Sequence, residues 1–276
     1  MAEFNQKIIC LLTDFGLKGQ HYVASMKGVM LKINPNIRIV NITHNITPFS
    51  IIEASYILKL TYMLFPEGSI FIIVVDPGVG SSREILAIKT KSNHYFIGPN
   101  NGIFSGTIAN NIEECIEIQN DYFFNKPISN TFHGRDIMAP VAAHLISGVP
   151  LNKFGPQFDQ NLIKKFPFKY NIDFKNKIVQ CVIQYIDTFG NITTNIPIAN
   201  NKIQNSEITL NEGKGIIVEI GEKIYEGHFT INFSSVPVGS ILFLIGSTGF
   251  LEISMNQGNA SKELGLNTGD IIKIKL

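Results

Sequence analysis

Two acidic side chains directly follow apolar runs that are typical of buried strands. Residues 71–75 are a continuous run of Phe, Ile and Val, which predicts a fully buried strand ending at Asp76. Asp14 follows the apolar run 8–12 in a similar way. In open α/β sheets, ligands bind outside the carboxyl ends of the strands, so both carboxylates are candidates for one ligand site. Spacing alone also allows each Asp to be only a capping residue of the next turn or helix.

Three further clusters carry side chains that bind ligands or transfer protons. Arg83 follows the second Asp after a Pro-Gly-Val-Gly-Ser-Ser turn, His133 and Arg135 precede an expected helix, and residues 187–191 read Asp-Thr-Phe-Gly-Asn. An ionised carboxylate such as Asp14 only accepts hydrogen bonds and can hold two vicinal hydroxyls, as a ribose requires.

Several common site types are excluded by their missing motifs. The glycines of residues 78–83 lack the Lys and the spacing of a phosphate-binding loop, and no dinucleotide-binding glycine motif follows the first strand. The six histidines show no metal-ligand spacing. We therefore expect an enzyme without a metal or another cofactor.

Composition narrows the class of protein. The 276 residues are 45% hydrophobic and 16% charged, which fits one large or two ordinary globular domains. A net charge of +1 favours neither nucleic acid nor a membrane surface as a partner. The three cysteines are far apart, residues 1–7 have no leader pattern, and no apolar run reaches the roughly 18 residues that span a bilayer. We expect a cytoplasmic protein with a small-molecule substrate.

The first part of the chain predicts a doubly wound α/β domain with a mostly parallel sheet. The expected order is strand, helix, strand, helix, strand, over residues 8–12, 20–34, 38–43, 50–64 and 69–75. Ser50 and Glu53 form the pattern of a capping box at the start of the second helix.

The middle of the chain is less regular. We expect a hairpin over residues 85–90 and 95–97, closed by the Gly-Pro-Asn-Asn-Gly stretch 98–102. Asp136 is expected to cap a helix that ends near residue 147, and residues 150–176 read as a linker.

From about residue 177 the periodicity is almost purely that of strands, which predicts a small all-β barrel or sandwich without a helix. The expected strands are 178–186, 192–196, 207–210, 215–220, 223–226, 240–245, 250–254 and 270–275. The expected domains are residues 1–170 and 171–276.

Taken together, eight ordered motifs resemble the S-adenosylmethionine (SAM) hydroxide adenosyltransferases, which are hydrolases related to the SAM-dependent fluorinase and chlorinase. The motifs lie at residues 12–16, 46–48, 65–68, 75–80, 98–102, 131–136, 187–191 and 256–260. The resemblance spans nearly the whole chain. It implies an α/β domain followed by a β-barrel, and a homotrimer whose active sites lie between subunits.

The resemblance also assigns roles to matching positions. Asp76, Arg83 and His133 match a set thought to activate water. The substrate-binding positions that it implies are Asp14, Phe49, Asp187, Phe189, Asn191, Ser247, Glu252, Met255 and Asn256.

Within that second set, Asp14 would hold the ribose hydroxyls and Phe49 would pack on the ribose. Asp187 would meet the methionine ammonium, Asn191 the adenine edge and Ser247 the methionine carboxylate. The backbone around residues 255–259 would complete the adenine pocket.

Three positions distinguish this chain from the fluorinase branch, which carries Tyr at Asp76, Ser at Gly134 and Arg at Thr248. Burying a halide beside the carboxylate of Asp76 would be strongly unfavourable, so this position favours water or hydroxide as the nucleophile. The missing Arg leaves open how the methionine carboxylate is held.

The resemblance therefore implies attack of water on the 5′ carbon of SAM, giving adenosine and L-methionine. The leaving group departs as a neutral thioether and needs no general acid. Arg83 would clamp the nucleophile electrostatically, and whether Asp76 or His133 takes the proton stays open. The alternatives are a SAM-dependent halogenase, a non-catalytic SAM- or adenosine-binding protein, and a nucleic-acid module, which the near-zero charge disfavours.

Overall fold

The computed structural model describes residues 8–166 and 169–276, so the polar segment 1–7 lies outside the described residues. The chain divides into two compact units, Met1–Phe166 and Pro167–Leu276. In the described part of the chain, no helix combines the length and apolar character needed to cross a membrane.

The first unit contains a six-stranded sheet in the order β2-β1-β3-β5-β4-β6. The first four of these strands are parallel neighbours, and β4 and β6 are antiparallel to theirs. The strands in sheet order are β2 (Arg38–Thr43), β1 (Ile8–Thr13), β3 (Ile70–Val74), β5 (Tyr95–Pro99), β4 (Ile85–Thr90) and β6 (Ile112–Glu117). The prediction of a mostly parallel α/β domain is confirmed.

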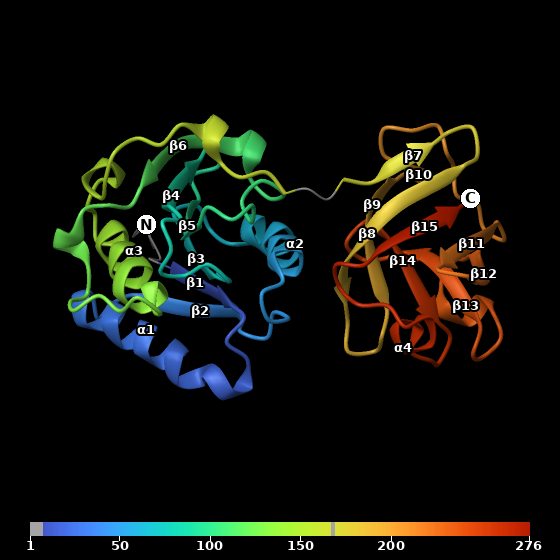
Figure 1. The fold of residues 1–276 in the computed structure, drawn as a ribbon, viewed down its shortest axis with the longest axis horizontal. Helices are drawn as coiled ribbons and strands as arrows, with labels where there is room; N and C mark the ends of the chain where they lie inside the picture. The colour runs from blue at the N-terminus through green and yellow to red at the C-terminus, as the bar shows by residue number, and fades with distance from the viewer. Residues whose placement is uncertain (1–7, 167–168) are drawn as a thin grey trace, which may run out of the picture. The chain divides into compact units, whose positions relative to one another are not determined.

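Helices cover both faces of this sheet, as Figure 1 shows. On one face lie α1 (Gln20–Ile33) and α3 (Ala139–Ile146), and α2 (Ile51–Thr61) lies on the other and continues as the 3₁₀ turn η2 (Tyr62–Leu64). Successive side chains of β3 alternate between these two apolar layers, which explains why its sequence is apolar without interruption.

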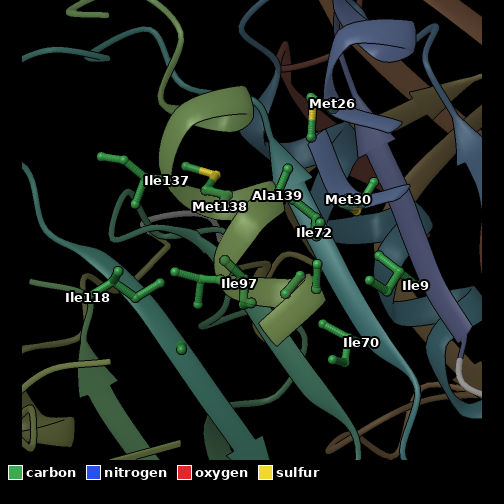
Figure 2. Packing of buried hydrophobic residues seen from close by; sticks show 14 of the residues in the cluster. Ile9, Met26, Met30, Ile70, Ile72, Ile97, Ile118, Ile137, Met138 and Ala139 are labelled. Carbon is green, nitrogen blue, oxygen red and sulfur yellow. The ribbon is translucent and has the colours of Figure 1, made fainter. Parts of the chain in front are cut away.

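Figure 2 shows the layer under α1 and α3, where Met26 and Met30 face isoleucines of the sheet. The opposite layer packs Leu58 of α2 near Phe71 and Phe96, whose rings stack with centroids 5.1 Å apart. Both layers are completely buried at their centres, so each helix is held by its apolar stripe.

Several local expectations were wrong. Gly98 and Pro99 lie inside β5, so the turn between β4 and β5 is formed by residues 91–94, and β6 was not predicted. Ser50 caps α2 by accepting from the Glu53 amide at 3.3 Å, but the Glu53 carboxylate accepts from the Thr47 amide at 3.2 Å and closes no capping box.

Asp136 caps no helix either. It lies within the π-helical turn η5 (Gly134–Met138), which leads directly into α3, and its carboxylate is fully buried in a hydrogen-bond network. Asp136 lies inside this turn and not at its start, which the sequence pattern does not reveal, so it is not the N-cap of η5 or of α3.

The expected linker 150–176 is also wrong over its first part. Leu151 and Phe154 are buried in the core under α3, and Phe158 and Ile163 are buried in the opposite core layer. The Lys, Asn and Pro residues between them hide an apolar residue at every third to fifth position, which anchors this segment to the first unit.

The second unit is a closed β-barrel of seven strands, because β8 pairs with both β15 and β9. Around the barrel the strands are β8 (Ile178–Ile186), β9 (Ile192–Ala199), β14 (Phe250–Met255), β13 (Ile241–Ile245), β12 (Lys223–Phe229), β11 (Gly215–Ile220) and β15 (Ile271–Lys275). The short strands β7 (Asn171–Asp173) and β10 (Lys202–Ile203) extend it. The barrel prediction is confirmed.

Two expectations for this unit were wrong. Residues 207–210 form only an isolated bridge between Lys202 and Thr209, and a short helix, α4 (Ala260–Leu264), is present. The side chain of Asn259 caps α4 by accepting from the Lys262 amide at 2.7 Å.

Replacing Phe154 tests whether the segment after α3 belongs to the core of the first unit. Phe154→Ala should lower the free energy of unfolding by about 3–5 kcal/mol, because it leaves a cavity among buried side chains. The matched control Leu162→Ala, at a side chain that is 63% exposed, should change it by less than about 0.5 kcal/mol. Denaturant unfolding of both variants measures this, and equal effects would contradict the assignment.

Candidate functional site

The first unit contains a cavity of about 680 Å³ at the carboxyl edge of its parallel strands. Thr13 at the end of β1 is paired with Val74 at the end of β3, so the residues that follow these strands emerge side by side. Four residues predicted from the sequence line this cavity: Asp14, Phe49, Asp76 and His133. The structure therefore brings together groups from four separate motifs.

Asp14 is held by the segment that follows β2. Its Oδ2 accepts a hydrogen bond from the Phe49 amide at 2.9 Å. Burial raises the pKa of Asp14 and the charge of Asp76 raises it further, while the Phe49 amide acts in the opposite direction. Phe49 itself has a φ of 67° and a ring that is 66% exposed, an unusual backbone state for a non-glycine residue.

Asp76 is paired with Arg83. Its Oδ1 accepts from the Gly78 amide at 3.0 Å and forms an ion pair with Nη1 of Arg83. A Cβ at Gly78 would lie 2.3 Å from the guanidinium, so a glycine here is what allows Arg83 to fold back over the turn. Arg83 does not line the cavity, and its Nε is buried without a hydrogen-bond partner among the described residues.

The turn after Asp76 touches the segment that carries His133. Gly80 has a φ of 81°, and a Cβ there would lie 2.2 Å from the carbonyl oxygen of Asn130. Because this contact is made by backbone on both sides, it fixes the separation between the Asp76 turn and the residues leading to His133.

His133 precedes the π-helical turn η5, a distortion that is frequent at functional sites. Behind it, the buried Asp136 accepts from Nε of Arg135 at 2.7 Å, from Nδ2 of Asn125 at 2.9 Å and from the Ser129 amide at 2.9 Å. Burial by itself raises the pKa of Asp136, but these hydrogen bonds outweigh it and the net pKa is lowered. The network fixes the wall of the cavity.

Sequence reasoning missed part of this wall. Phe15 and Tyr22, which were not predicted, line the cavity beside the expected Phe132, and the three rings contact one another with centroids 5.2–5.9 Å apart. Arg135 lies over the ring of Phe132 at 5.1 Å. Tyr22 is 44% exposed and lies outside the buried stripe of α1, so its position in the sequence does not mark it.

The barrel unit has a cavity of its own, of about 730 Å³. It is lined by Asp187, Phe189, Asn191, Phe233, Met255, Gln257, Gly258 and Asn259. Four of the sequence-predicted residues thus lie together, with further residues of the expected segment 255–259, whereas Phe233 was not singled out.

The loop 187–191 is held rigidly by its own side chains. Asp187 accepts from the amides of Phe189 and Asn191 and from Nδ2 of Asn191, each at 2.9 Å. Gly190 has a φ of 87° and lies so close to Asn259 that a Cβ would be 2.2 Å away. Phe189 is left 75% exposed at the tip, available to stack on a planar ligand.

Besides Arg83, three predicted residues line neither cavity. Ser247 lies in the turn between β13 and β14. Glu252 accepts from Ser254 at 2.9 Å, and burial, with a contribution from Asp187, raises its pKa. Asn256 is 9% exposed and donates from Nδ2 to the Val236 carbonyl at 2.7 Å.

The first cavity combines charged side chains with aromatic walls. Within residues 8–166 and 169–276, no three His, Cys, Asp or Glu side chains are grouped so that they could hold a metal ion. A carboxylate paired with Arg83, an adjacent imidazole and aromatic walls can orient a polar nucleophile and exclude bulk water.

Asp14→Asn should raise the thermal midpoint at neutral pH by about 1–3 °C. Because the folded-state pKa of Asp14 is raised, its ionised form lowers native stability above that pKa, and this cost disappears as the carboxyl group protonates. The gain should therefore shrink as pH falls through that pKa. Asp121→Asn, at a 66% exposed carboxylate paired with Lys126, is the control and should give no gain. Calorimetric scans at several pH values measure both; a loss of stability with Asp14→Asn at pH 7 would contradict this account.

Comparison with known proteins matches this arrangement to one family. Residues 9–155 match the model of the SAM hydroxide adenosyltransferase N-terminal domain, and residues 181–273 match that of its C-terminal domain. The chain is 36% identical over 277 residues to the (R)-S-adenosyl-L-methionine hydrolase of Methanocaldococcus jannaschii, covering 97% of this chain and 95% of that protein.

It is 26% identical over 294 residues to a fluorinase of an Actinoplanes species, covering 95% of each. A crystal structure of an uncharacterized conserved protein from Thermotoga maritima is 38% identical, with a TM-score of 0.84, covering 97% of this chain and all of that one. Because the two family models together cover most of the sequence, the chain belongs to the SAM hydroxide adenosyltransferase family.

Proposed function

We propose that this protein hydrolyses S-adenosyl-L-methionine to adenosine and L-methionine, by attack of water on the ribose 5′ carbon. The observation that carries the proposal is the Asp76–Arg83 pair beside the cavity that Asp14 and His133 also line. It is supported by relatives named (R)-S-adenosyl-L-methionine hydrolase that match over nearly the whole chain.

The nucleophile is water because Asp76 faces the cavity. A halide placed beside this carboxylate would lose its hydration and be repelled. The neighbouring Gly134 adds a second obstacle: a Cβ there would lie 3.1–3.2 Å from the methyl groups of Val74, so the serine expected in a fluorinase would need this wall to shift. Both features favour hydrolysis over halogenation.

Four residues that line the first cavity, together with Arg83, have roles in the proposed reaction. Asp14 holds the ribose hydroxyls and Phe49 packs on the sugar. Asp76 and His133 orient the water and one of the two receives its single proton, while Arg83 acts through Asp76 as a fixed positive charge. Attack of a hydroxide-like oxygen on the carbon bonded to a sulfonium cancels charge, so aromatic walls that exclude water favour the transition state.

The barrel cavity binds the remaining parts of the substrate. Phe189 and Met255 pack on the adenine, with Asn191 and the backbone near Asn256 at its polar edge. Asp187 binds the methionine ammonium. Ser247 binds the methionine carboxylate, and Glu252 lies in the same region.

We further propose that the protein is a cytoplasmic homotrimer without a cofactor, in which each active site combines the α/β unit of one subunit with the barrel of a neighbour. Nucleic acid and membranes are not partners in this proposal. An exposed Phe189 and a half-exposed Phe233 beside the barrel cavity support it, because such rings need a partner surface or a ligand.

Incubation with SAM in chloride-free buffer, with chromatographic separation of the products, tests the function. Wild-type protein should yield adenosine and methionine in equal amounts. Asp76→Asn should lower the rate by about 10²–10⁴-fold, since it removes the charge that orients the water. The control Asp121→Asn removes an exposed carboxylate of the same unit and should leave the rate unchanged.

Each alternative outcome has its own meaning. Tight binding of SAM with no products would indicate a non-catalytic binding protein. A 5′-halogenated nucleoside that forms only when halide is added would mean that Asp76 does not exclude anions.

Mixing two inactive variants tests the shared site. Asp76→Asn damages only the α/β half and Asp187→Asn only the barrel half. If each site takes its halves from two subunits, random mixed trimers contain both intact halves in about one site in four, so activity should recover to about a quarter of wild type. Unfolding and refolding the variants together, followed by the SAM assay, measures this. No recovery would count against a site shared between subunits.

A further inference from the structure

His44 is a buried histidine next to the first cavity for which the proposed chemistry has no use. It directly follows β2 and is 7% exposed. Its Nδ1 lies 3.0 Å from Oγ1 of Thr13, which is fully buried and adjacent in sequence to Asp14. The side chain of His44 is therefore hydrogen-bonded to the residue that precedes Asp14.

The backbone of the same residues completes this attachment. The β1–β2 ladder becomes irregular between Leu11 and Leu12. Beyond that point the Gly16 amide donates to the His44 carbonyl at 2.7 Å, and the Ile46 amide donates to the Thr13 carbonyl at 3.4 Å. These two hydrogen bonds hold the turn 13–16 against the segment after β2, beyond the regular part of the β1–β2 ladder.

That segment also supplies the direct contact with Asp14. Within this segment, the Thr47 amide donates to the buried carboxylate of Glu53. Two residues later, the Phe49 amide donates to Oδ2 of Asp14. His44 therefore stands at the start of the six-residue path 44–49, whose other end fixes the carboxylate itself. A shift at His44 would move both the backbone and the hydrogen-bond donor of Asp14.

The imidazole makes this attachment through one atom. Burial and the charge of Lys27 on α1 lower the pKa of His44, so the ring is neutral at neutral pH. Its Nε2 is buried and has no hydrogen-bond partner in the part of the chain that the structure describes. A side chain that presents a polar atom only near the position of Nδ1, such as Asn, should therefore replace it, and Leu should not.

We propose that His44 is a positioning residue that sets the place of the Asp14 carboxylate through its bond to Thr13. It touches no reacting atom. The inference rests on the proposed function in one respect, the role of Asp14 in holding the ribose hydroxyls.

The test compares binding of adenosine and of 2′,3′-dideoxyadenosine to the full-length protein by calorimetry. Wild type should prefer adenosine by at least about tenfold, because a buried acceptor is left unpaired by the analogue. His44→Leu should reduce that preference to less than about threefold, as should Asp14→Asn, while His44→Asn should keep it within about twofold of wild type. Thr13→Val removes the same bond from its other side and should behave like His44→Leu.

The outcomes separate this inference from the proposed function. A His44→Leu or Thr13→Val variant that folds, as judged by circular dichroism, and keeps the wild-type preference would overturn the role of His44, whatever wild type does with SAM. In a second outcome, wild type binds adenosine selectively but does not hydrolyse SAM, and both variants lose the preference. This result would support the role of His44 and overturn the proposed function. No preference in wild type would overturn the ribose assignment and this inference together.

Discussion

Two carboxylates must share one edge of the sheet, and much of the first unit serves to make that possible. The parallel pairing of β1 with β3 forces Asp14 and Asp76 to follow neighbouring strands, and their like charges repel, which contributes to the raised pKa of Asp14. The ion pair with Arg83 offsets the charge of Asp76. That pair depends on Gly78, because a Cβ at this position would collide with the guanidinium of Arg83 where it now lies.

Most of the fold follows from patterns that the sequence makes explicit. The apolar runs of β1 and β3, the apolar stripe of α1 and the short alternating strands of the barrel are each typical of one kind of secondary structure. The structure confirms these elements. Errors occurred where long-range packing overrides local pattern. Phe154 is embedded in a stretch of polar residues, and Asp136 is buried with hydrogen bonds from Arg135 and from the preceding loop, an arrangement that the local pattern does not reveal.

The candidate site was predictable for a related reason. Asp14, Asp76 and His133 have side chains that bind ligands or transfer protons, and a glycine follows each of them within two residues. They can therefore be found in the sequence. The sequence alone does not show which turns touch. The backbone contact of Gly80 with Asn130, and the bond of His44 to Thr13, depend on a meeting of segments more than 30 residues apart. The aromatic wall of Tyr22 was missed because an exposed ring on a helix has no distinctive spacing.

The closure of the barrel has a consequence for how copies of this chain can associate. In the seven-strand ring every strand has a hydrogen-bonded neighbour on both sides, and the strands at the two ends of the strand order, β7 and β10, have only three and two residues. Edges so short offer almost no backbone to an incoming strand. Association through either end of this strand order would therefore depend on side-chain shape and not on extension of the sheet.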